Sequence, residues 1–573
     1  MGGPLIDGCS LRDTTVIALD CQSTGANPAH GHLLEIGWVA ARASQPAAAP
    51  TSFLVRLPDG AGIPSRVQAL TGIAMADLVA AVEPRCAWEA LAKAAAAARN
   101  GDATALAIVH HAQFEKPFLQ HLHETHGAGA PFPLEIICTR EIAQRLLPNL
   151  PRRGLSALVG YFGATPPMLR RCSDHISATV WVWRHLVELL DKQFGIRTFD
   201  ALRQWLANPR PGKRCHEYPL PRAMRLALPR GPGVYRFLRR NGDILYIGKA
   251  ASLRQRVNSY FRKQTRVPDR LLEMLTQAHS VETTTTSSAL EAALLESDEI
   301  KKHSPRYNVA LRGENRSLCF ASTDFSTQSP VPERGFPLGP FPAAAIVTAF
   351  AELCSVLRGA ELTTEAICSV LTVRPENAPS VECFAQGLLY FRAECLAGFG
   401  ADALESSLLR VGDSLWEQRL AERDRQDEES AEELPTPEKD VAPPAWDSSR
   451  VARALKENTL RAAHAKRRAE WLCDLSECSL IWRGDECRSL IIEQGKLVQA
   501  GNVDEDTMPP VPPGQAKATL ERQRCFDIAT YDRLVVLTAE LRRLVSESTQ
   551  MWLRLGRERV LDKEGVSRAL QWI

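Results

Sequence analysis

The stretch LPRGPGVYRFLRRNGDILYIGKAASLRQRVNSYF, residues 228–261, decides the fold in the middle of the chain. Two short apolar runs, GVYRFL and ILYIG, flank an Asn-Gly-Asp sequence at 241–243. Apolar strands on either side of an Asn-Gly turn are a strong hairpin signal. We therefore expect a β-hairpin, followed by a helix that carries two arginines and Tyr260.

A second informative segment is ALEAALLESDEIKKHSPRYNVAL, residues 289–311, a predicted helix that places Glu296 among leucines and alanines. Phosphodiester hydrolysis needs a base for the attacking water, cationic groups for the transition state and usually a metal ion. The tyrosines, arginines, lysine and carboxylate of the two segments can provide these groups. The same residues also fit a structural interpretation, with half-buried strand tyrosines and a solvated arginine face.

The exact string narrows this choice. The signature triplets are Gly-Val-Tyr at 233–235 and Tyr-Ile-Gly at 246–248. The following GKAASLRQRVNSYF is similar to the pattern GKAxNLxxRVxSYF, and EAALLE…IKKHSPRYNVALRG to EAxLLE…IKxxxPxYNVxLR. Together they resemble the GIY-YIG nuclease domain of the excinuclease UvrC and of its shorter homologue Cho. The resemblance implies a small α/β nuclease domain over residues 227–315.

The resemblance also implies roles for seven residues, none of which is substituted here. It implies that Glu296 binds a single Mg²⁺ or Mn²⁺, that Tyr246 is the general base supported by Tyr235, that Arg256 stabilises the pentacoordinate phosphorus, that Lys249 and Tyr260 position the phosphate, and that Asn308 anchors the site.

Local charge agrees with a DNA substrate. Residues 222–312 contain 17 Lys and Arg against 8 Asp and Glu, within a chain whose net charge is only +2. A basic cluster of this kind is the electrostatic footprint of a phosphate backbone. A basic face that serves solubility alone explains less well why the charge gathers around the motif.

The segment 10–195 has an α/β pattern, with strand-like runs TTVIALDCQ, HLLEIGWVAAR and ALAIVHHA between helical stretches. Its outline resembles the DnaQ-type 3′–5′ exonucleases of the DEDDh group, which implies an RNase H-like fold. DCQSTG stands where that family has D-x-E-T-T-G, HHAQFE where it has H-N-A-x-F-D, and RRCSDHISAT near the third motif.

The chemistry of that exonuclease family needs four carboxylates for two metal ions and a histidine base. Asp20 is retained, but the other positions differ: Gln22 replaces a glutamate, Glu115 an aspartate, Arg170 the histidine, and His175 the last aspartate, with Asp174 beside it. A neutral amide is a weak ligand for a hard cation, and arginine cannot accept a proton. We therefore expect an exonuclease-like domain without exonuclease activity, which binds DNA or a protein partner or serves only as a scaffold.

The predicted fold class is multidomain α/β: the RNase H-like domain, the small GIY-YIG domain, a helical region and an α+β region. Between and after the two nuclease-like domains we expect, in order, a linker at 196–226, a mostly helical region at 316–420, a disordered charged linker at 421–447 and an α+β region at 448–573. The helical region resembles the part of UvrC that follows its nuclease domain. The basic helix near 448–472 fits either a phosphate-binding surface or a solvated face.

Cysteine spacing argues against a metal cluster. In many UvrC proteins the helical region leads to four cysteines that suit an iron–sulfur cluster. Here only Cys395 occupies an expected position, Gly387 and Phe399 stand at neighbouring ones, and Cys368 and Cys383 have a different spacing. We expect no cluster there, and we interpret the other suggestive set, Cys473, Cys478 and Cys487, as core residues rather than zinc ligands.

The bulk composition predicts a soluble cytoplasmic protein. The 573 residues are 45% hydrophobic and 24% charged, without a run of apolar residues long enough for a membrane span or a signal peptide. The fifteen cysteines are scattered singly, as in a reducing compartment.

We therefore expect a DNA repair endonuclease of the nucleotide-excision type that makes a single nick. No second acidic nuclease domain and no tandem helix–hairpin–helix module is recognisable, so one active centre should make one cut. A UvrB-like damage-recognition partner is implied by the family alone. Two alternatives stay open: a bifunctional 3′–5′ exonuclease and endonuclease, and a non-catalytic repair scaffold.

Overall fold

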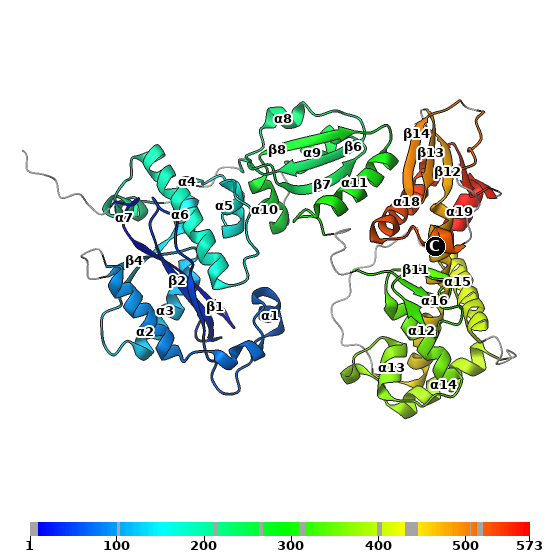
Figure 1. Ribbon diagram of the computed structural model, residues 1–573, viewed down its shortest axis with the longest axis horizontal. Coiled ribbons are helices and arrows are strands. Elements are labelled where there is room, and N and C mark those ends of the chain that lie inside the picture. Colours follow the sequence, from blue (N-terminus) through cyan, green and yellow to red (C-terminus); the bar gives the residue numbers. More distant parts are fainter. Residues whose placement is uncertain are drawn as a thin grey trace, which may run out of the picture. The chain divides into compact units, whose positions relative to one another are not determined.

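The computed structural model describes residues 10–99, 104–209, 212, 216–262, 267–309, 316–397, 404–429, 445–484, 486–504, 506–512, 519–557 and 559–573. The chain divides into two compact units (Figure 1). The first contains residues up to 231 with 235–284 and 305–307, and the second contains 232–234, 285–304 and everything after 307. Each unit is described by itself.

The N-terminal part of the first unit is built on a five-stranded mixed sheet. Its strands are β1 (Val16–Ser23), β2 (Leu33–Ala41), β3 (Thr51–Leu54), β4 (Ala105–Val109) and β5 (Leu134–Cys138), in the order β3-β2-β1-β4-β5. Strand β2 is antiparallel to both β1 and β3, whereas β4 and β5 run parallel to β1. The accompanying helices are α1 (Ser65–Thr71), the 3₁₀ helix η1 (Met75–Ala80), α2 (Pro84–Ala97), α3 (Ala112–His126), α4 (Thr139–Leu146), α5 (Leu155–Tyr161) and α6 (Cys172–Phe194).

The central strand β1 is apolar on both faces because helices cover both sides of the sheet. Val16 and Ala18 pack in one core with α4, α5 and α6. Ile17, Leu19 and Cys21 alternate with them and pack in a second core with α2 and α3. A continuous apolar run is the pattern expected of a strand buried on both faces. The sheet and its two layers confirm the predicted α/β class of this segment.

The segment expected to form the nuclease domain contains a three-stranded sheet with the order β7-β6-β8, which we call the nuclease core together with its helices α9 and α10. Its elements are β6 (Gly233–Leu238), β7 (Ile244–Ala250), α9 (Leu253–Ser259), α10 (Asp269–Gln277) and β8 (Ser280–Thr285). The predicted hairpin forms between β6 and β7, where Gly242 has φ +90° and the Asn241 side chain accepts from the Asp243 amide at 3.1 Å. A left-handed backbone at this position is the reason for the glycine.

The stretch 196–226, expected to be a linker, contains two short helices. They are α7 (Phe199–Ala207) and α8 (Arg222–Leu226). Phe199 and Leu202 are buried in the core beneath α6, so the first of these helices packs as part of the N-terminal domain. The predicted boundaries of the domains themselves stay predictions.

The second unit begins with α11 (Ala289–His303), the helix that carries Glu296. It packs against α18 (Ile528–Glu547), and Leu290 and Leu294 enter the same apolar core as that helix. The buried carboxylate of Asp532 on α18 forms an ion pair with Lys301, with 2.5 Å between Oδ2 and Nζ. The C-terminal region of the chain therefore holds α11 through both apolar and ionic contacts.

The remainder of the second unit combines a helical part and an antiparallel sheet. The helical part has a small sheet of β9 (Cys319–Ala321), β10 (Gln328–Ser329) and β11 (Leu338–Phe341), and the helices α12 (Ala344–Leu357), α13 (Thr364–Leu371), η2 (Pro375–Asn377), α14 (Val381–Cys395), α15 (Leu404–Glu429) and α16 (Ser448–Leu475). The C-terminal sheet has the order β14-β13-β12-β15-β16. Its elements are β12 (Cys478–Arg483), β13 (Cys487–Glu493), β14 (Lys496–Asn502), β15 (Gln550–Leu555) and β16 (Arg559–Asp562), with α17 (Thr519–Gln523) and α19 (Lys563–Gln571) beside α18. The predicted fold class is therefore confirmed from end to end.

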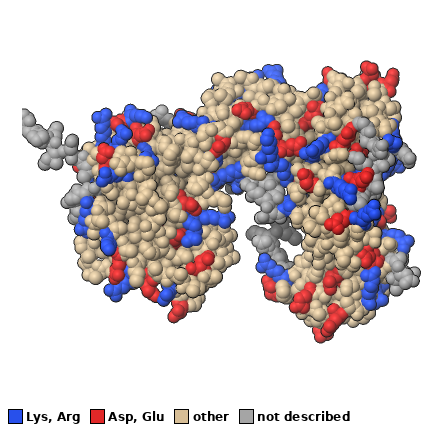
Figure 2. Space-filling model, viewed as in Figure 1, with Lys and Arg blue, Asp and Glu red and all other residues tan. Residues whose placement is uncertain are grey.

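The long basic helix α16 crosses two apolar cores, with Val451 and Leu455 in one and Trp471 and Leu472 in the other. Its cationic side chains are largely paired with carboxylates. The pairs are Lys456–Glu394, Arg461–Glu457, Lys466–Glu470 and Arg467–Asp413. Figure 2 shows both signs of charge interspersed over the second unit on the face drawn. These pairs account for four of the basic side chains of α16, and both interpretations of this helix stay predictions.

Several smaller predictions fall on these elements. Of the predicted disordered linker, residues 421–429 belong to α15, and 430–444 lie outside the described residues, as does Phe399. The cysteines discussed above lie on α13, α14, α16 and the C-terminal sheet, and Cys473, Cys478 and Cys487 are buried. Within the described ranges, no helix is both long and apolar enough to cross a membrane.

Candidate active site

Three tyrosines meet in the nuclease core. Tyr235 lies on β6, Tyr246 on the neighbouring strand β7, and Tyr260 directly after α9. Their ring centroids are 6.1 to 6.4 Å apart. The hairpin and the helix that follows it therefore bring together phenol groups that are 25 residues apart in the chain.

The Tyr235 hydroxyl is the centre of this cluster. Its ring is fully buried, and its oxygen lies 2.7 Å from the Tyr260 hydroxyl. Burial, together with the neighbouring tyrosines, raises the pKa of Tyr235 well above its usual range. Tyr235 therefore keeps its proton and acts as a neutral hydrogen-bonding group.

Arg256 adds a positive charge to the cluster from the exposed side of α9. Its guanidinium lies 5.2 Å from the centroid of the Tyr260 ring and hydrogen-bonds to Tyr235. Partial burial lowers the pKa of Arg256, but the contacts with Tyr260 and Tyr235 outweigh it, so that the pKa is raised. A guanidinium held beside phenol groups is suited to contact the oxygens of a phosphodiester.

The glycine of the Tyr-Ile-Gly triplet has a steric reason. A Cβ atom at Gly248 would lie 2.4 Å from the Tyr235 hydroxyl oxygen. Any side chain there would displace the hydroxyl that pairs with Tyr260. The two signature triplets therefore depend on each other: the glycine of one leaves room for the tyrosine of the other.

The remaining predicted residues are placed as follows. Lys249 is exposed at the end of β7, and Glu296 is half-buried on α11. Asn308 is buried directly after Tyr307. Glu296 and Asn308 belong to the second unit, whereas the tyrosines and Arg256 belong to the first. The structure thus brings together four of the seven residues, and the complete catalytic set stays a prediction.

The exonuclease-like motifs meet at the C-terminal end of β1. Asp20 is buried and both of its carboxylate oxygens have partners within the domain. Gln22 donates to one oxygen at 3.2 Å, and His175 of α6 contacts the other at 3.2 Å. Burial lowers the pKa of His175, but the hydrogen bond and charge of Asp20 outweigh it and leave that pKa raised.

Glu115, from α3, is the second buried carboxyl of this place. Burial, and then the charge of Asp20, raise the pKa of Glu115 to about 8. One of its oxygens, Oε2, is buried without a hydrogen-bond partner among the described residues. Glu115 is therefore protonated at neutral pH and adds no negative charge beside Asp20.

The other two predicted positions of this site have structural roles. Asp174 accepts from the amides of Arg170 and Arg171 at 3.4 and 3.2 Å, which caps the start of α6. Within the described part of the chain, no three His, Cys, Asp or Glu side chains are arranged to hold a metal ion.

Two residues of this site were not predicted. Glu35 on β2 is 1% exposed and pairs with Arg171 through both oxygens, at 2.9 and 3.1 Å. Its only signal in the sequence is a single carboxylate in the apolar run HLLEIG. The second is Arg140, in the first turn of α4, whose Nε is buried without a hydrogen-bond partner among the described residues.

The surroundings of Arg140 are cationic. Burial, and then the charge of Arg140, lower the pKa of both His111 and Arg153. Burial also lowers the pKa of His110 to about 3, and its ring is fixed between Thr139 at 2.9 Å and the Arg153 carbonyl at 3.1 Å. The charge of Arg140 therefore acts on His110, His111 and Arg153.

Comparison with known proteins agrees with the nuclease core. Residues 231–309 match a family described as the UvrC-like GIY-YIG domain. The predicted relation to UvrC-type GIY-YIG nucleases is therefore confirmed for this part of the chain.

Two relatives match different lengths of this chain. A protein of Mycobacterium tuberculosis with the provisional name bifunctional exonuclease/endonuclease protein is 31% identical over 368 residues, which are 61% of this chain and 54% of that protein. UvrABC system protein C of a Psychrobacter species is 44% identical over 125 residues, 20% of each chain. The chain thus spans about half the length of the first relative and a fifth of the second.

Two solved structures are also similar. One is the magnesium-bound GIY-YIG N-terminal endonuclease domain of UvrC from Thermotoga maritima, 39% identical, covering 15% of this chain and 94% of that one with a TM-score of 0.14. The other is Escherichia coli exonuclease I in complex with a dT13 oligonucleotide, 12% identical, covering 39% of this chain and 48% of that one with a TM-score of 0.28.

Proposed function

We propose that this chain is a metal-dependent DNA endonuclease that nicks one strand through the site of residues 227–315. The observation that carries the proposal is the cluster of three tyrosines and Arg256 within a domain of the UvrC-like GIY-YIG family. The basic character of residues 222–312 supports a polyanionic substrate.

In this proposal the side chains divide the chemistry among them. Tyr246 takes the proton of the attacking water, and Tyr235, which keeps its own proton, supports it by hydrogen bonding. Arg256 stabilises the charge that develops on the phosphate oxygens. Lys249 and Tyr260 position the phosphate, and Asn308 anchors the chain after α11.

The donor set fits Mg²⁺ or Mn²⁺ at Glu296. Mg²⁺ is commonly held by one or two carboxylates together with water and substrate phosphate oxygens. Glu296 is a half-buried carboxylate on α11 and is a protein ligand of this kind. When bound, the ion would neutralise charge on the scissile phosphate.

Conversion of supercoiled plasmid to open circle tests the endonuclease. Purified protein with Mg²⁺ or Mn²⁺ should nick the plasmid, and Glu296→Gln should not, while DNA binding in a filter assay changes less than about threefold. Glu299→Gln, on the same helix, is the matched control. Nicking that persists in Glu296→Gln would reject the metal assignment, and a wild-type protein that never nicks would favour a non-catalytic scaffold.

For the N-terminal domain we propose DNA binding without exonuclease activity. Gln22 and His175 already occupy both oxygens of Asp20, and Glu115 is protonated at neutral pH. The unpartnered Nε of Arg140, in a cationic surrounding, supports binding of a phosphate group instead. Replacing Arg140 with Gln should weaken binding of single-stranded DNA and reduce its salt dependence.

The bifunctional alternative has support in the name of the Mycobacterium tuberculosis relative. Full-length Glu296→Gln with Mn²⁺ and a 5′-labelled single strand distinguishes the two. We expect the label to stay in intact strands. A ladder of shortened products that disappears on Asp20→Asn would establish the bifunctional enzyme.

A role in nucleotide-excision repair, in the cytoplasm and with a UvrB-like partner, is the finer proposal. The similarity to UvrABC system protein C supports it. Damaged and undamaged plasmids, each with and without a pre-loaded damage-recognition complex, provide the test. One incision per lesion that requires the complex is expected, and equal nicking of all four samples would contradict a loading partner.

A further inference from the structure

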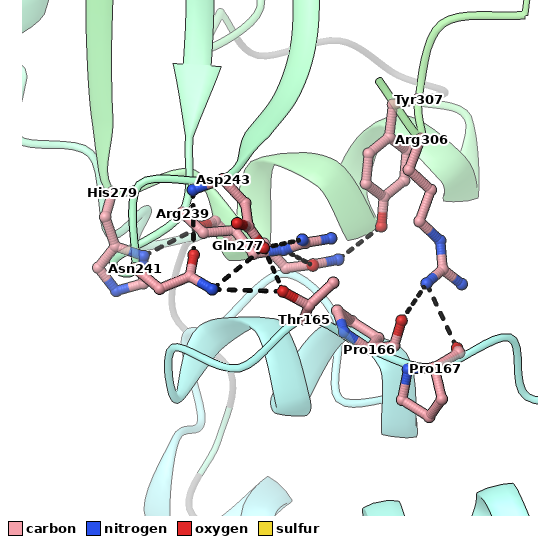
Figure 3. Close-up of polar contacts among 10 residues, drawn as sticks. All are labelled: Thr165, Pro166, Pro167, Arg239, Asn241, Asp243, Gln277, His279, Arg306 and Tyr307. Atoms are coloured by element: carbon pink, nitrogen blue, oxygen red, sulfur yellow. Dashed lines mark hydrogen bonds and ion pairs between the residues drawn. The ribbon is translucent and has the colours of Figure 1, made fainter. Parts of the chain in front are cut away.

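The N-terminal domain and the nuclease core share a contact surface inside the first unit. Helix α5 and the following segment to Pro167 meet α10 and the β6–β7 turn (Figure 3). At its edge, the Thr165 hydroxyl donates to Asp243, and Arg306 donates to the Pro166 carbonyl at 3.0 Å. Polar groups of both domains are therefore satisfied by each other.

The centre of this surface is the side chain of Gln277, at the end of α10. It is completely buried, and its amide makes three hydrogen bonds, one of which runs from its nitrogen to the Glu273 carbonyl at 3.2 Å. Its oxygen accepts from Arg239 at 3.0 Å, and its nitrogen donates to the Tyr307 hydroxyl at 2.5 Å. Figure 3 shows these three side chains in one row between the two domains.

Tyr307 is linked to the N-terminal domain through a shared acceptor, Glu273. Its hydroxyl donates to Glu273 at 2.7 Å, and the same carboxylate oxygen accepts from Ser156 of α5 at 3.0 Å. Burial, and then the charge of Glu273, raise the pKa of Tyr307, so the hydroxyl keeps its proton and the direction of this bond is fixed. A side chain of the N-terminal domain thus shares an acceptor with a residue of the nuclease core.

Tyr307 in turn contacts the strand that carries the candidate base. Its backbone amide donates to the Leu245 carbonyl on β7 at 3.1 Å. Tyr246 is the next residue of that strand. The hydrogen bonds therefore run without a gap from α5, through α10 and Tyr307, to the backbone beside Tyr246.

The contact surface leaves no space at one glycine of α5. A Cβ atom at Gly160 would lie 2.0 Å from the Gln277 side-chain oxygen and 2.4 Å from its carbonyl carbon. Because the Gln277 amide is enclosed and hydrogen-bonded on both sides, a single added methyl group must displace it. The packing of Gln277 against α5 therefore requires a glycine at position 160.

We propose that the N-terminal domain positions the nuclease site, with Gln277 and Tyr307 as positioning residues that transmit its contact to Tyr246 on β7. This inference rests on the proposed endonuclease function. It gives the exonuclease-like domain a role that needs no metal and no catalytic residue of its own.

Gly160→Ala is the direct test, with Gly154→Ala as its matched control. Gly154 precedes the same helix at φ −69°, and a Cβ there would meet nothing within 4 Å. Misplacement of a reacting group by about 1 Å can cost on the order of a hundredfold in rate. We expect Gly160→Ala to lower the single-turnover nicking rate about tenfold or more, with the Kd for DNA unchanged, and Gly154→Ala to nick like the wild type.

A double-mutant cycle shows whether the effect passes through Gln277. Gly160→Ala should have no further effect in a Gln277→Ala background, because the displaced group is already absent. Tyr307→Phe, which removes only a hydroxyl, should slow nicking similarly. Tyr531→Phe is its control, because the buried Tyr531 hydroxyl has no hydrogen-bond partner among the described residues. Additive effects in the cycle, or wild-type rates in Gly160→Ala and Tyr307→Phe, would overturn the proposal.

A spectroscopic readout separates this proposal from the endonuclease function. The chain has eight tyrosines, so fluorotyrosine labelling gives a small ¹⁹F spectrum in which Tyr246→Phe identifies one signal. That signal should shift in Gly160→Ala and not in Gly154→Ala, whether or not the protein nicks DNA. An unmoved Tyr246 signal would reject the positioning role, whereas a wild-type protein that fails to nick would reject only the proposed function.

Discussion

The tyrosine cluster of the nuclease core and the Asp20 cluster of the N-terminal domain are both dense polar sites, but they differ in what their hydrogen bonds leave available. In the nuclease core, Tyr235 and Tyr260 bond to each other, and Arg256 stands exposed beside them. In the N-terminal domain, the two carboxylate oxygens of Asp20 form hydrogen bonds with Gln22 and His175. The nuclease core keeps an exposed guanidinium beside its tyrosines, whereas both oxygens of Asp20 are already hydrogen-bonded within the N-terminal domain.

This difference shows that a family outline and a competent site are separate properties. The mixed sheet of the N-terminal domain depends on a central strand that is apolar on both faces, a pattern that tolerates a change from glutamate to glutamine at position 22. Metal chemistry does not tolerate it, because the amide donates a proton where a ligand must offer an anion. The following predictions test the comparison from its largest expected effect to its smallest.

Removal of Arg256 should have the largest effect. Arg256→Ala is expected to lower plasmid nicking by about a thousandfold, because the group opposite the developing phosphate charge is lost. Binding of DNA should change by less than about threefold. Gln255→Ala, exposed on the same turn, should nick normally, and a matching loss in that variant would show that the helix rather than the guanidinium is responsible.

The buried carboxyl of Glu115 should make stability depend on pH. Its pKa is about 8 in the folded protein, raised from its usual 4.5 by burial and by Asp20. A raised pKa favours the folded state fully below about pH 4.5, and that contribution is lost as pH rises through about 8. Glu115→Gln should therefore match the wild type at pH 5 and exceed its unfolding free energy by roughly 2–4 kcal/mol at pH 9.

Urea denaturation at both pH values measures this effect, with Glu124→Gln on the exposed side of the same helix as control. Equal unfolding free energies for Glu115→Gln and the wild type at pH 9 would mean that Glu115 ionises without cost. The Asp20 cluster would then be closer to a competent acidic site than its geometry indicates.

The smallest expected effect is that of restoring one carboxylate. Gln22→Glu places a second negative charge 3.2 Å from Asp20 in place of a hydrogen-bond donor. We expect a loss of about 1–2 kcal/mol in unfolding free energy at pH 7. If millimolar Mn²⁺ restored this loss and the Asp20→Asn double variant removed the restoration, the site would prove to be one substitution away from binding metal.

The sequence predicted those parts of the site that depend on local pattern. The Asn-Gly-Asp turn fixes the register of β6 and β7, and that register places Tyr235 beside Tyr246. The apolar runs likewise predicted β1 and its neighbours. The positions of Glu296 and Asn308 around the phosphate stay predictions from family resemblance.

What the sequence could not show depends on contacts between distant segments. Gln277 looks like a polar residue at a helix end, and only the approach of Gly160 and Tyr307 makes it a buried connection. Arg140 and Glu35 carry no motif of their own, because the one is distinguished by a missing partner and the other by a partner 136 residues away. The basic helix α16 was ambiguous in part for the same reason, since two of its carboxylate partners, Glu394 and Asp413, lie on other helices.

The packing of α11 against α18 has a consequence for protein engineering. Expressing residues 227–315 as a separate domain would expose Leu290 and Leu294 to solvent and would leave Lys301 without its ion-pair partner Asp532. The exposed apolar side chains would promote self-association, and the helix that carries Glu296, the proposed metal ligand, would lose its anchor. In this chain α11 and the C-terminal region share a hydrophobic core. A transferred domain must therefore include the C-terminal region, or one face of α11 must be redesigned.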